Sequence, residues 1–407
     1  MPSKALWLGG AGVAIGFAAL AWFGGDGADP ATGGAASTAP AARAGRQPFF
    51  DLAGNAIAAT PENRAERRLA LAQQFELADT TYCTYARSTQ YPPESRPIAE
   101  HPDQVYPNAP VTDSHPMRSA DGKSDGAVQI QTSQSRVFMA SGEAAAFSLR
   151  AVDTQGKTLS LVVTRAAAQG VTYNGQRASA QITLPFADDG QGADAVSGDG
   201  AFAGILAPAQ TGLASFNGTI RTEVRYTVEG KAGFVLFDVI YTPELPATWS
   251  GQVRESVEDG SLVYYLKANV QKAGRYAVQG RVDDAKGRPF ALASFNDTLP
   301  AGPAEVRLTV FGKLLRDKEP ALPLTLRDVD GYLLKENVDP DRALMPRLEG
   351  KVLVGKAHPV KGFSEAEWQS EERTRHLLEF SKDLALAKGA ITQFDPALAP
   401  PKSACLP

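Results

Sequence analysis

Histidine and cysteine are scarce in this sequence, and positive charge is nowhere concentrated. Of 407 residues only four are histidine and two are cysteine, and the formal net charge is −4. The histidines have no ligand-like spacing to one another or to a cysteine, which argues against a transition-metal site. The thin spread of lysine and arginine argues against a nucleic-acid-binding protein, which would gather positive charge on one face.

Recognisable catalytic motifs are also missing. The sequence has no G-x-S-x-G and no H-E-x-x-H, and Gly122-Lys123-Ser124 lacks the upstream glycine of a phosphate-binding loop. We therefore expect no enzymatic activity. A hydrolase with an unrecognised site stays as an alternative, because serines and carboxylates distant in sequence can meet in space.

A long apolar run opens the chain. Lys4 precedes an uninterrupted apolar stretch from Ala5 to Phe23, so residues 1–23 are predicted to be a signal peptide or a membrane anchor. Ala19-Leu20-Ala21 fits a signal peptidase site, whereas the length of the run approaches that of a membrane span. Residues 24–47 are mostly small and polar and are predicted to be a flexible linker, which favours the anchor slightly.

Both interpretations of this segment imply export. We expect the protein in the periplasm or on the cell surface, contacting the inner membrane through the N-terminal segment alone. In such an oxidising compartment Cys83 and Cys405 are expected to form a disulfide that ties the N-terminal region to the C-terminal tail. Two free thiols are the alternative.

Glycine and proline are plentiful, at 38 and 28 residues, and they separate short apolar runs as in strand-and-turn proteins. Residues 220–229 alternate between β-compatible and charged or polar side chains, which predicts a strand with one buried face. Phe234 to Tyr241 is nearly all apolar, as in a central strand. Strand signals then resume after Thr242-Pro243, which predicts a domain boundary there.

Two segments outside the strand-rich part have their own patterns. A helix is predicted from Pro61, and the proline-rich stretch after it is expected to wrap over a neighbouring domain or to serve as a docking strip. Ser364 and Glu367 form a capping box before a helix predicted over 365–388.

The predicted fold is mainly β, with two tandem immunoglobulin-like β-sandwich domains, an irregular N-terminal region and a C-terminal helix. Its predicted parts are the segments 1–23 and 24–47, the irregular region 48–126, the sandwiches 127–243 and 244–345, and the C-terminal part 346–407.

The most informative local sequence is an acidic, glycine-rich loop between two strand candidates. It contains Asp188, Asp189, Asp194 and Asp199, and we predict that these carboxylates bind a structural calcium ion. Crowded carboxylates repel one another unless a cation holds them, and calcium takes oxygen ligands. The alternative is a solvated acidic hairpin in which Asp and Gly serve as turn residues.

This loop resembles one that recurs in immunoglobulin-like domains of bacterial surface and exported proteins. The shared pattern is Asp189-Gly190-x-x-x-Asp194-x-x-x-x-Asp199-Gly200-x-Phe202, in which Phe202 replaces the usual tyrosine. A similar loop occurs in the β-sandwich domain of calcium-activated chloride channel regulators. The later segment Gly287 to Gly312 resembles the companion domain that follows this loop in bacterial proteins.

Together these segments resemble the exported bacterial family catalogued as domain of unknown function 4785, or its neighbours, over roughly residues 127–335. The resemblance implies a fold and a location but no activity. We expect a non-catalytic envelope protein that binds another envelope protein or a glycan. A structural spacer or assembly factor is the alternative, because such folds host many roles.

Overall fold

The computed structural model describes residues 49–50, 56–57, 61–119, 122–172 and 179–406. The predicted signal or anchor segment and the predicted linker lie outside the described residues. The chain divides into two compact units, residues 1–67 and 68–407. In the first unit, strand β1 (Phe49–Phe50) pairs with β2 (Ala56–Ile57), and helix α1 (Pro61–Ser88) begins there and continues into the second unit.

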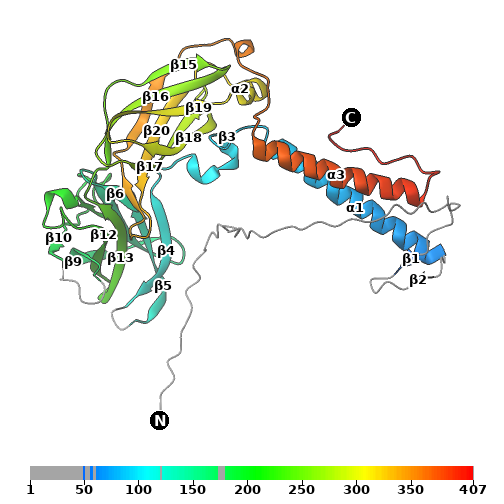
Figure 1. Ribbon diagram of the computed structural model, residues 1–407. Coiled ribbons are helices and arrows are strands. Elements are labelled where there is room, and N and C mark those ends of the chain that lie inside the picture. Colours follow the sequence, from blue (N-terminus) through cyan, green and yellow to red (C-terminus); the bar gives the residue numbers. More distant parts are fainter. Residues whose placement is uncertain (1–48, 51–55, 58–60, 120–121, 173–178, 407) are drawn as a thin grey trace, which may run out of the picture. The chain divides into compact units, whose positions relative to one another are not determined.

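The fold is mainly β, which confirms the predicted class (Figure 1). The described residues of the second unit contain two β-sandwiches and a pair of helices. No helix among the described residues is both long enough and apolar enough to cross a membrane.

The first sandwich contains one sheet with the strand order β10-β9-β12-β13-β6 and a second with the order β11-β7-β5-β4, in which β8 pairs with β7. The Phe147 ring of the second sheet stacks on the Phe237 ring of the first, with 4.7 Å between their centroids. The strands are β4 (Val111–Arg118), β5 (Ser124–Gln134), β6 (Phe138–Ala140), β7 (Ala145–Asp153), β8 (Thr158–Leu159), β9 (Leu161–Gly170), β10 (Gln181–Thr183), β11 (Phe202–Leu206), β12 (Gly218–Val228) and β13 (Lys231–Thr242).

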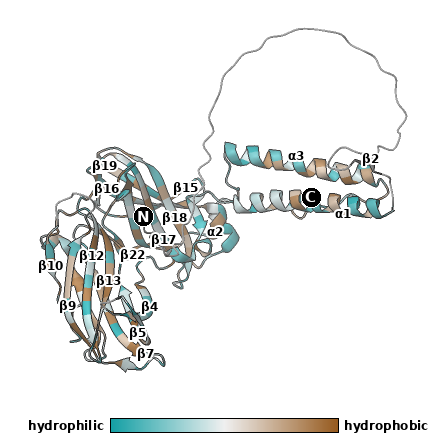
Figure 2. Ribbon diagram, turned by 90° about the horizontal axis from the view of Figure 1, so that it is seen from below, coloured by the Kyte–Doolittle hydropathy of each residue, from teal (hydrophilic) through white to brown (hydrophobic). Residues whose placement is uncertain are grey.

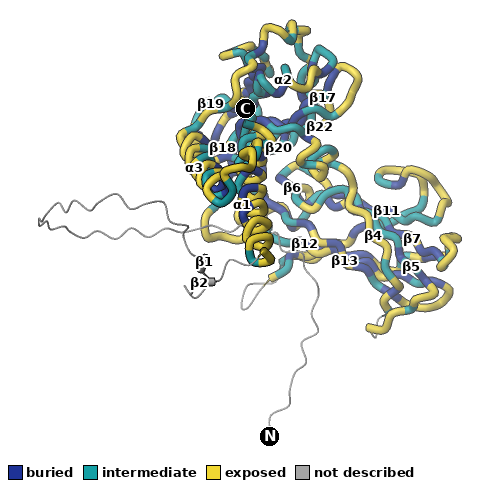
Figure 3. Tube along the Cα trace, turned by 90° about the vertical axis from the view of Figure 1, so that its right-hand side faces the viewer, coloured by how far each residue is buried: buried dark blue, intermediate teal, exposed yellow. Residues whose placement is uncertain are grey.

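Strand β12 shows why this sequence forms a sandwich. Alternate residues from Ile220 to Val228 are at most 1% exposed, while the residues between them are partly or fully exposed. The period of two in the sequence therefore places one face of the strand in the core, as predicted. In Figure 3 the buried positions follow the strands through the interior of each sandwich.

The first sandwich begins earlier than the sequence indicated. Strand β4 lies at the edge of its sheet and pairs with β5 from Val111 onwards, so the boundary predicted at residue 127 is wrong. The sequence of β4, VTDSHPMR, has little apolar alternation and contains Pro116. An edge strand tolerates both features because only one of its sides must form a hydrogen-bonded ladder.

The second sandwich contains one sheet with the order β14-β16-β15, in which β19 pairs with β16, and another with the order β21-β20-β17-β18-β3, in which β22 pairs with β20. Its elements are β3 (Ser95–Pro97), β14 (Ala247–Trp249), β15 (Arg254–Glu258), β16 (Ser261–Val270), β17 (Gly274–Asp283), β18 (Pro289–Leu299), β19 (Gly302–Val310), helix α2 (Gly312–Lys318), β20 (Thr325–Leu334), β21 (Arg342–Leu344) and β22 (Leu348–Val354).

Two strands of this sandwich lie outside the predicted range 244–345. Strand β22 extends it to Val354, and β3 joins it from the proline-rich segment by pairing with β18. Further along that segment the Gln104 carbonyl accepts a hydrogen bond from Arg281 at 3.1 Å. The proline-rich segment thus lies on the second sandwich, although the first sandwich separates the two in the sequence.

Helices α1 and α3 (Glu371–Phe394) lie side by side and antiparallel in Figures 1 and 2. Leu71 and Phe75 of α1 cluster with Leu384 and Ile391 of α3.

The C-terminal helix differs from its prediction at both ends. Ser370, rather than Ser364, caps it by accepting a hydrogen bond from the Arg373 N–H at 3.0 Å. The helix also continues through Gly389 to Phe394. A glycine inside a helix costs only about 1 kcal/mol, and the packing of Ile391 and Phe394 in the helix cluster offsets that cost.

Candidate functional site: an acidic loop beside a polar groove

The acidic loop connects β10 to β11 on the first sandwich. Ala187 and Ala203 form an isolated antiparallel bridge at its base, with backbone N–H to carbonyl distances of 3.0 and 2.9 Å. Gly190, Gly198 and Gly200 have φ values of +73°, +73° and +83°. Residues other than glycine rarely adopt this left-handed backbone conformation, so these glycines let the loop fold tightly.

Three of the four predicted ligands meet in this loop. Carboxylate oxygens of Asp188, Asp194 and Asp199 all lie within 4.8 Å of one another. Calcium–oxygen bonds are about 2.3–2.6 Å long, so two oxygens on one ion lie within about 5 Å of each other. The three carboxylates therefore stand at distances that one calcium ion can bridge.

Asp189 lies outside this group. Its Oδ1 accepts a hydrogen bond from the Gln191 N–H at 3.0 Å, which closes a local turn. Asp199 makes the equivalent turn, because its Oδ1 accepts from the Ala201 N–H at 2.9 Å. Each of the two residues thus accepts one hydrogen bond within its own turn. Only the Asp199 carboxylate also lies close to those of Asp188 and Asp194.

Backbone N–H groups hold Asp188 and Asp194 in place. Asp188 accepts from Gly198 at 2.6 Å and from Gly200 at 2.9 Å, one bond to each oxygen. Asp194 is only 8% exposed, and its Oδ2 accepts from Gly190 at 2.6 Å. Each carboxylate oxygen has two acceptor sites, so these bonds leave capacity for a cation. A solvated acidic hairpin would have the same bonds, and the calcium response described below separates the two.

A polar groove of about 650 Å³ lies on the outer face of the sheet that contains β4, β5 and β7. Ser114, Gln131 and Arg150 are cross-strand neighbours in one row, and Thr112, Ser133 and Ser148 form the next row. The Arg150 Nε donates to the Gln131 Oε1 at 2.6 Å. These six side chains offer hydroxyl, amide and guanidinium groups on a partly exposed surface.

The groove and the acidic loop meet at Ala201. This residue lines the groove, and its N–H is the donor to Asp199. The loop therefore forms one end of the groove, and any change in the position of Asp199 bears on the groove wall. The groove was not predicted from the sequence, because Thr112 and Ser114 lie in the segment that was expected to be irregular. The alternation of Val128 and Ile130 with Gln129 and Gln131 indicates a strand with one polar face, and this was the sequence signal for the groove.

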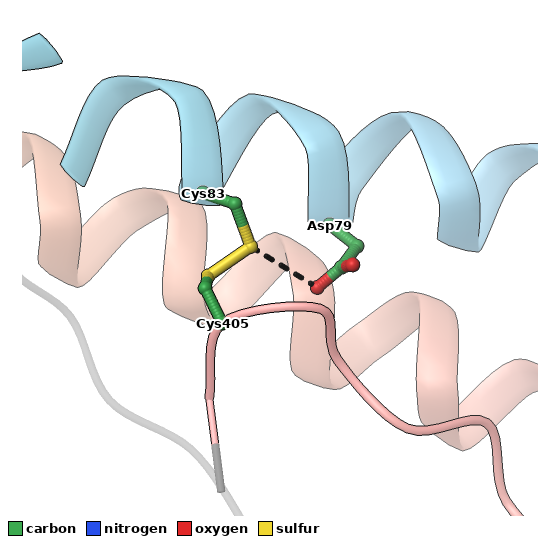
Figure 4. A group of neighbouring side chains, drawn as sticks. All are labelled: Asp79, Cys83 and Cys405. Atoms are coloured by element: carbon green, nitrogen blue, oxygen red, sulfur yellow. Dashed lines mark hydrogen bonds between the residues drawn. A yellow bond between two sulfur atoms is a disulfide. The ribbon is translucent and has the colours of Figure 1, made fainter. Parts of the chain in front are cut away.

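Cys83 of α1 and Cys405 of the C-terminal tail are joined by a disulfide, with 5.7 Å between their Cα atoms (Figure 4). Asp79 lies one helical turn before Cys83, and its Oδ1 is 3.6 Å from the Cys83 sulfur. Its Oδ2 accepts from the Ala404 N–H at 2.9 Å. Because the sulfurs are bonded to each other, they offer no thiolate to a metal, and the group serves to hold the tail.

The acidic pair Asp328 and Asp330 also has a structural role. Asp330 forms an ion pair with Arg281, and Asp328 accepts from Asn108 at 3.1 Å and from Arg327 at 2.7 Å. Each carboxylate thus has a basic partner and helps to hold the proline-rich segment on the second sandwich.

No family model and no curated protein matches this chain. Among solved structures, it is similar to a DUF4785 family protein from Legionella pneumophila at 14% identity and a TM-score of 0.37, over 56% of this chain and 57% of that one. It is also similar to the fibronectin(III)-like modules of CbhA from Clostridium thermocellum, at 13% identity and a TM-score of 0.18, over 54% and 89%. A third similarity is to trypsin-activated alpha-2-macroglobulin from Escherichia coli, at 13% and 0.19, over 56% and 15%. These similarities are too weak to place the chain in a family.

Proposed function

We propose that this chain is a non-catalytic, exported envelope protein whose first sandwich binds another envelope protein or a glycan in the polar groove. In this proposal a calcium ion on Asp188, Asp194 and Asp199 stiffens the loop at the end of the groove. The observation that carries it is the junction at Ala201, where the groove and the carboxylate group share a wall.

The chemistry of the groove favours a polar ligand. Its volume of about 650 Å³ falls within the range of small-molecule sites, about 300–1,000 Å³. The hydroxyls of Ser114 and Ser133 and the amide of Gln131 can both donate and accept hydrogen bonds. Sugar hydroxyls and peptide groups need this mixture, so both ligand classes belong to the proposal.

A structural spacer is the second candidate, and the junction between the sandwiches favours it. Arg136 pairs with Glu349 at 3.1 Å, and Arg347 donates to the Phe138 carbonyl at 3.1 Å. A spacer requires such fixed contacts but no occupied groove, so the loss of binding on altering the groove would distinguish the two functions.

Calcium is expected to raise the melting temperature of the full chain, and Asp199→Ala is expected to abolish this response. Calcium at about a hundred times its Kd stabilises a folded protein by about 2.7 kcal/mol, which amounts to several degrees in Tm. Differential scanning calorimetry with calcium and with EDTA measures the effect.

Asp189→Ala is the matched control, because it removes the same charge and an equivalent turn hydrogen bond. It should leave the calcium response intact. If the wild type shows no calcium response, or if both variants lose it equally, the loop is a solvated hairpin.

A further inference from the structure

An edge of the second sandwich is interrupted. Strand β19 pairs with β16 along its whole length, from Leu262 to Val270, so β14 and β15 must both lie along the opposite side of β16. Ser250 still donates its backbone N–H to the Lys267 carbonyl at 2.8 Å, but residues 251–253 leave the ladder, and Gly251 has a φ of +87° there. The break opens the side of the sandwich at this point, facing β22 of the other sheet.

A pocket of about 650 Å³ lies at this opening. Its apolar lining comes from both sheets and includes Trp249, Val253, Leu348 and Val352, which are all partly exposed and pack on the core of the sandwich. The indole N–H of Trp249 donates to the Pro346 carbonyl at 2.8 Å. The polar edge of the indole is therefore satisfied within the protein, and an apolar ligand can contact the ring without leaving that N–H unpaired.

The charges around the pocket are unbalanced. Glu349 pairs with Arg136 at 3.1 Å, and Arg347 donates to the Phe138 carbonyl. Lys267 and Lys351 are exposed, and neither ammonium group has a hydrogen-bond or ion-pair partner among the described residues. The pocket thus combines a cluster of apolar side chains with two lysines that have no partner among the described residues.

We propose that this pocket binds a single-chain amphiphile with a carboxylate head, that is, a medium-chain fatty acid. The methylene chain leaves water against the Trp249, Leu348 and Val352 side chains, and the carboxylate lies between the Lys267 and Lys351 ammonium groups. A neutral chain gains only the first interaction, and a cationic chain is repelled by the two lysines. The site is independent of the polar groove and of calcium.

Isothermal titration calorimetry on the full chain tests this with three probes of equal chain length, kept below their micelle concentrations. Dodecanoate is expected to bind more tightly than dodecanol, and dodecyltrimethylammonium is expected to bind most weakly. In Lys267→Gln/Lys351→Gln the dodecanoate affinity should fall about tenfold while the dodecanol affinity is unchanged, because two exposed ion pairs are lost.

The matched control is Lys272→Gln/Lys286→Gln, which removes two exposed lysines of the same sandwich away from the pocket. It should leave all three affinities unchanged. Val352→Phe fills the pocket and should weaken dodecanoate and dodecanol alike, with a thermal melt to check its fold. Absence of dodecanoate binding, an equal loss in both lysine pairs, or unchanged binding in a folded Val352→Phe variant would overturn the proposal.

Discussion

Replacing Arg281 with alanine is expected to lower the free energy of unfolding of the second sandwich by about 3 kcal/mol. The Arg281 side chain is 1% exposed. Its guanidinium forms an ion pair with Asp330 and donates to the Asp328 carbonyl at 2.9 Å and to the Gln104 side chain at 2.6 Å. With the Gln104 carbonyl, which also accepts from Arg281, the substitution leaves four acceptors without their donor, and it creates a cavity. The estimate is at the lower end for a broken buried pair because Asp330 is 34% exposed.

Arg275→Ala is the matched control for this prediction, since Arg275 lies on the same strand, β17, but is exposed. It makes a hydrogen bond to Asn296 at 2.8 Å, and its loss should cost about 0.5 kcal/mol or less. Urea unfolding followed by tryptophan fluorescence measures both variants. Equal effects of the two substitutions would show that the buried network around Arg281 does not hold this sandwich together.

Removing the disulfide is expected to destabilise the helical pair by about 2–5 kcal/mol, whether by reduction or by Cys83→Ser/Cys405→Ser. The two cysteines are 322 residues apart, so the cross-link greatly restricts the unfolded chain. It also holds the tail beside Asp79, which accepts the Ala404 N–H. The two sandwiches have their own hydrophobic cores, so their thermal unfolding transitions should not change.

Thermal melts followed by far-ultraviolet circular dichroism, with and without dithiothreitol, measure this effect. The reductant should lower the helical transition of the wild type to that of the double serine variant and leave the variant itself unchanged. A wild-type transition that the reductant does not shift would mean that the disulfide contributes nothing to the stability of the helical pair.

The sequence predicts the fold best where one face of a strand is buried and the other is exposed to solvent. Strand β12 was predicted by its alternation, because burial of every second residue dictates the residue types there. Strand β4 was missed because an edge strand carries little of that constraint. Strand β3 was missed because three residues within a proline-rich segment carry no period at all, and their position depends on pairing with β18.

The candidate site was predicted in part, for a similar reason. The density of aspartate and glycine marks the acidic loop, but the sequence cannot distinguish Asp189 from Asp199, since each makes the same local turn. The polar groove depends on the register of β4, β5 and β7, which brings Ser114, Gln131 and Arg150 into one row. Cross-strand register is a tertiary property, and local sequence specifies it only weakly on a face that is polar.

The most direct test of the proposed binding function is affinity capture from envelope extract on the immobilised full-length chain. The wild type is compared with Gln131→Ala/Arg150→Ala, which removes the central side chains of the groove. The control is Arg225→Ala/Thr227→Ala, on the outer face of the opposite sheet of the same sandwich. Each is run with calcium and with EDTA, and protease or glycosidase treatment of the retained material identifies its class.

The proposal predicts a protein or glycan that the wild type and the Arg225/Thr227 control retain in calcium, and that either EDTA or the Gln131/Arg150 variant releases. Retention that is equal in all three chains and indifferent to calcium would contradict it.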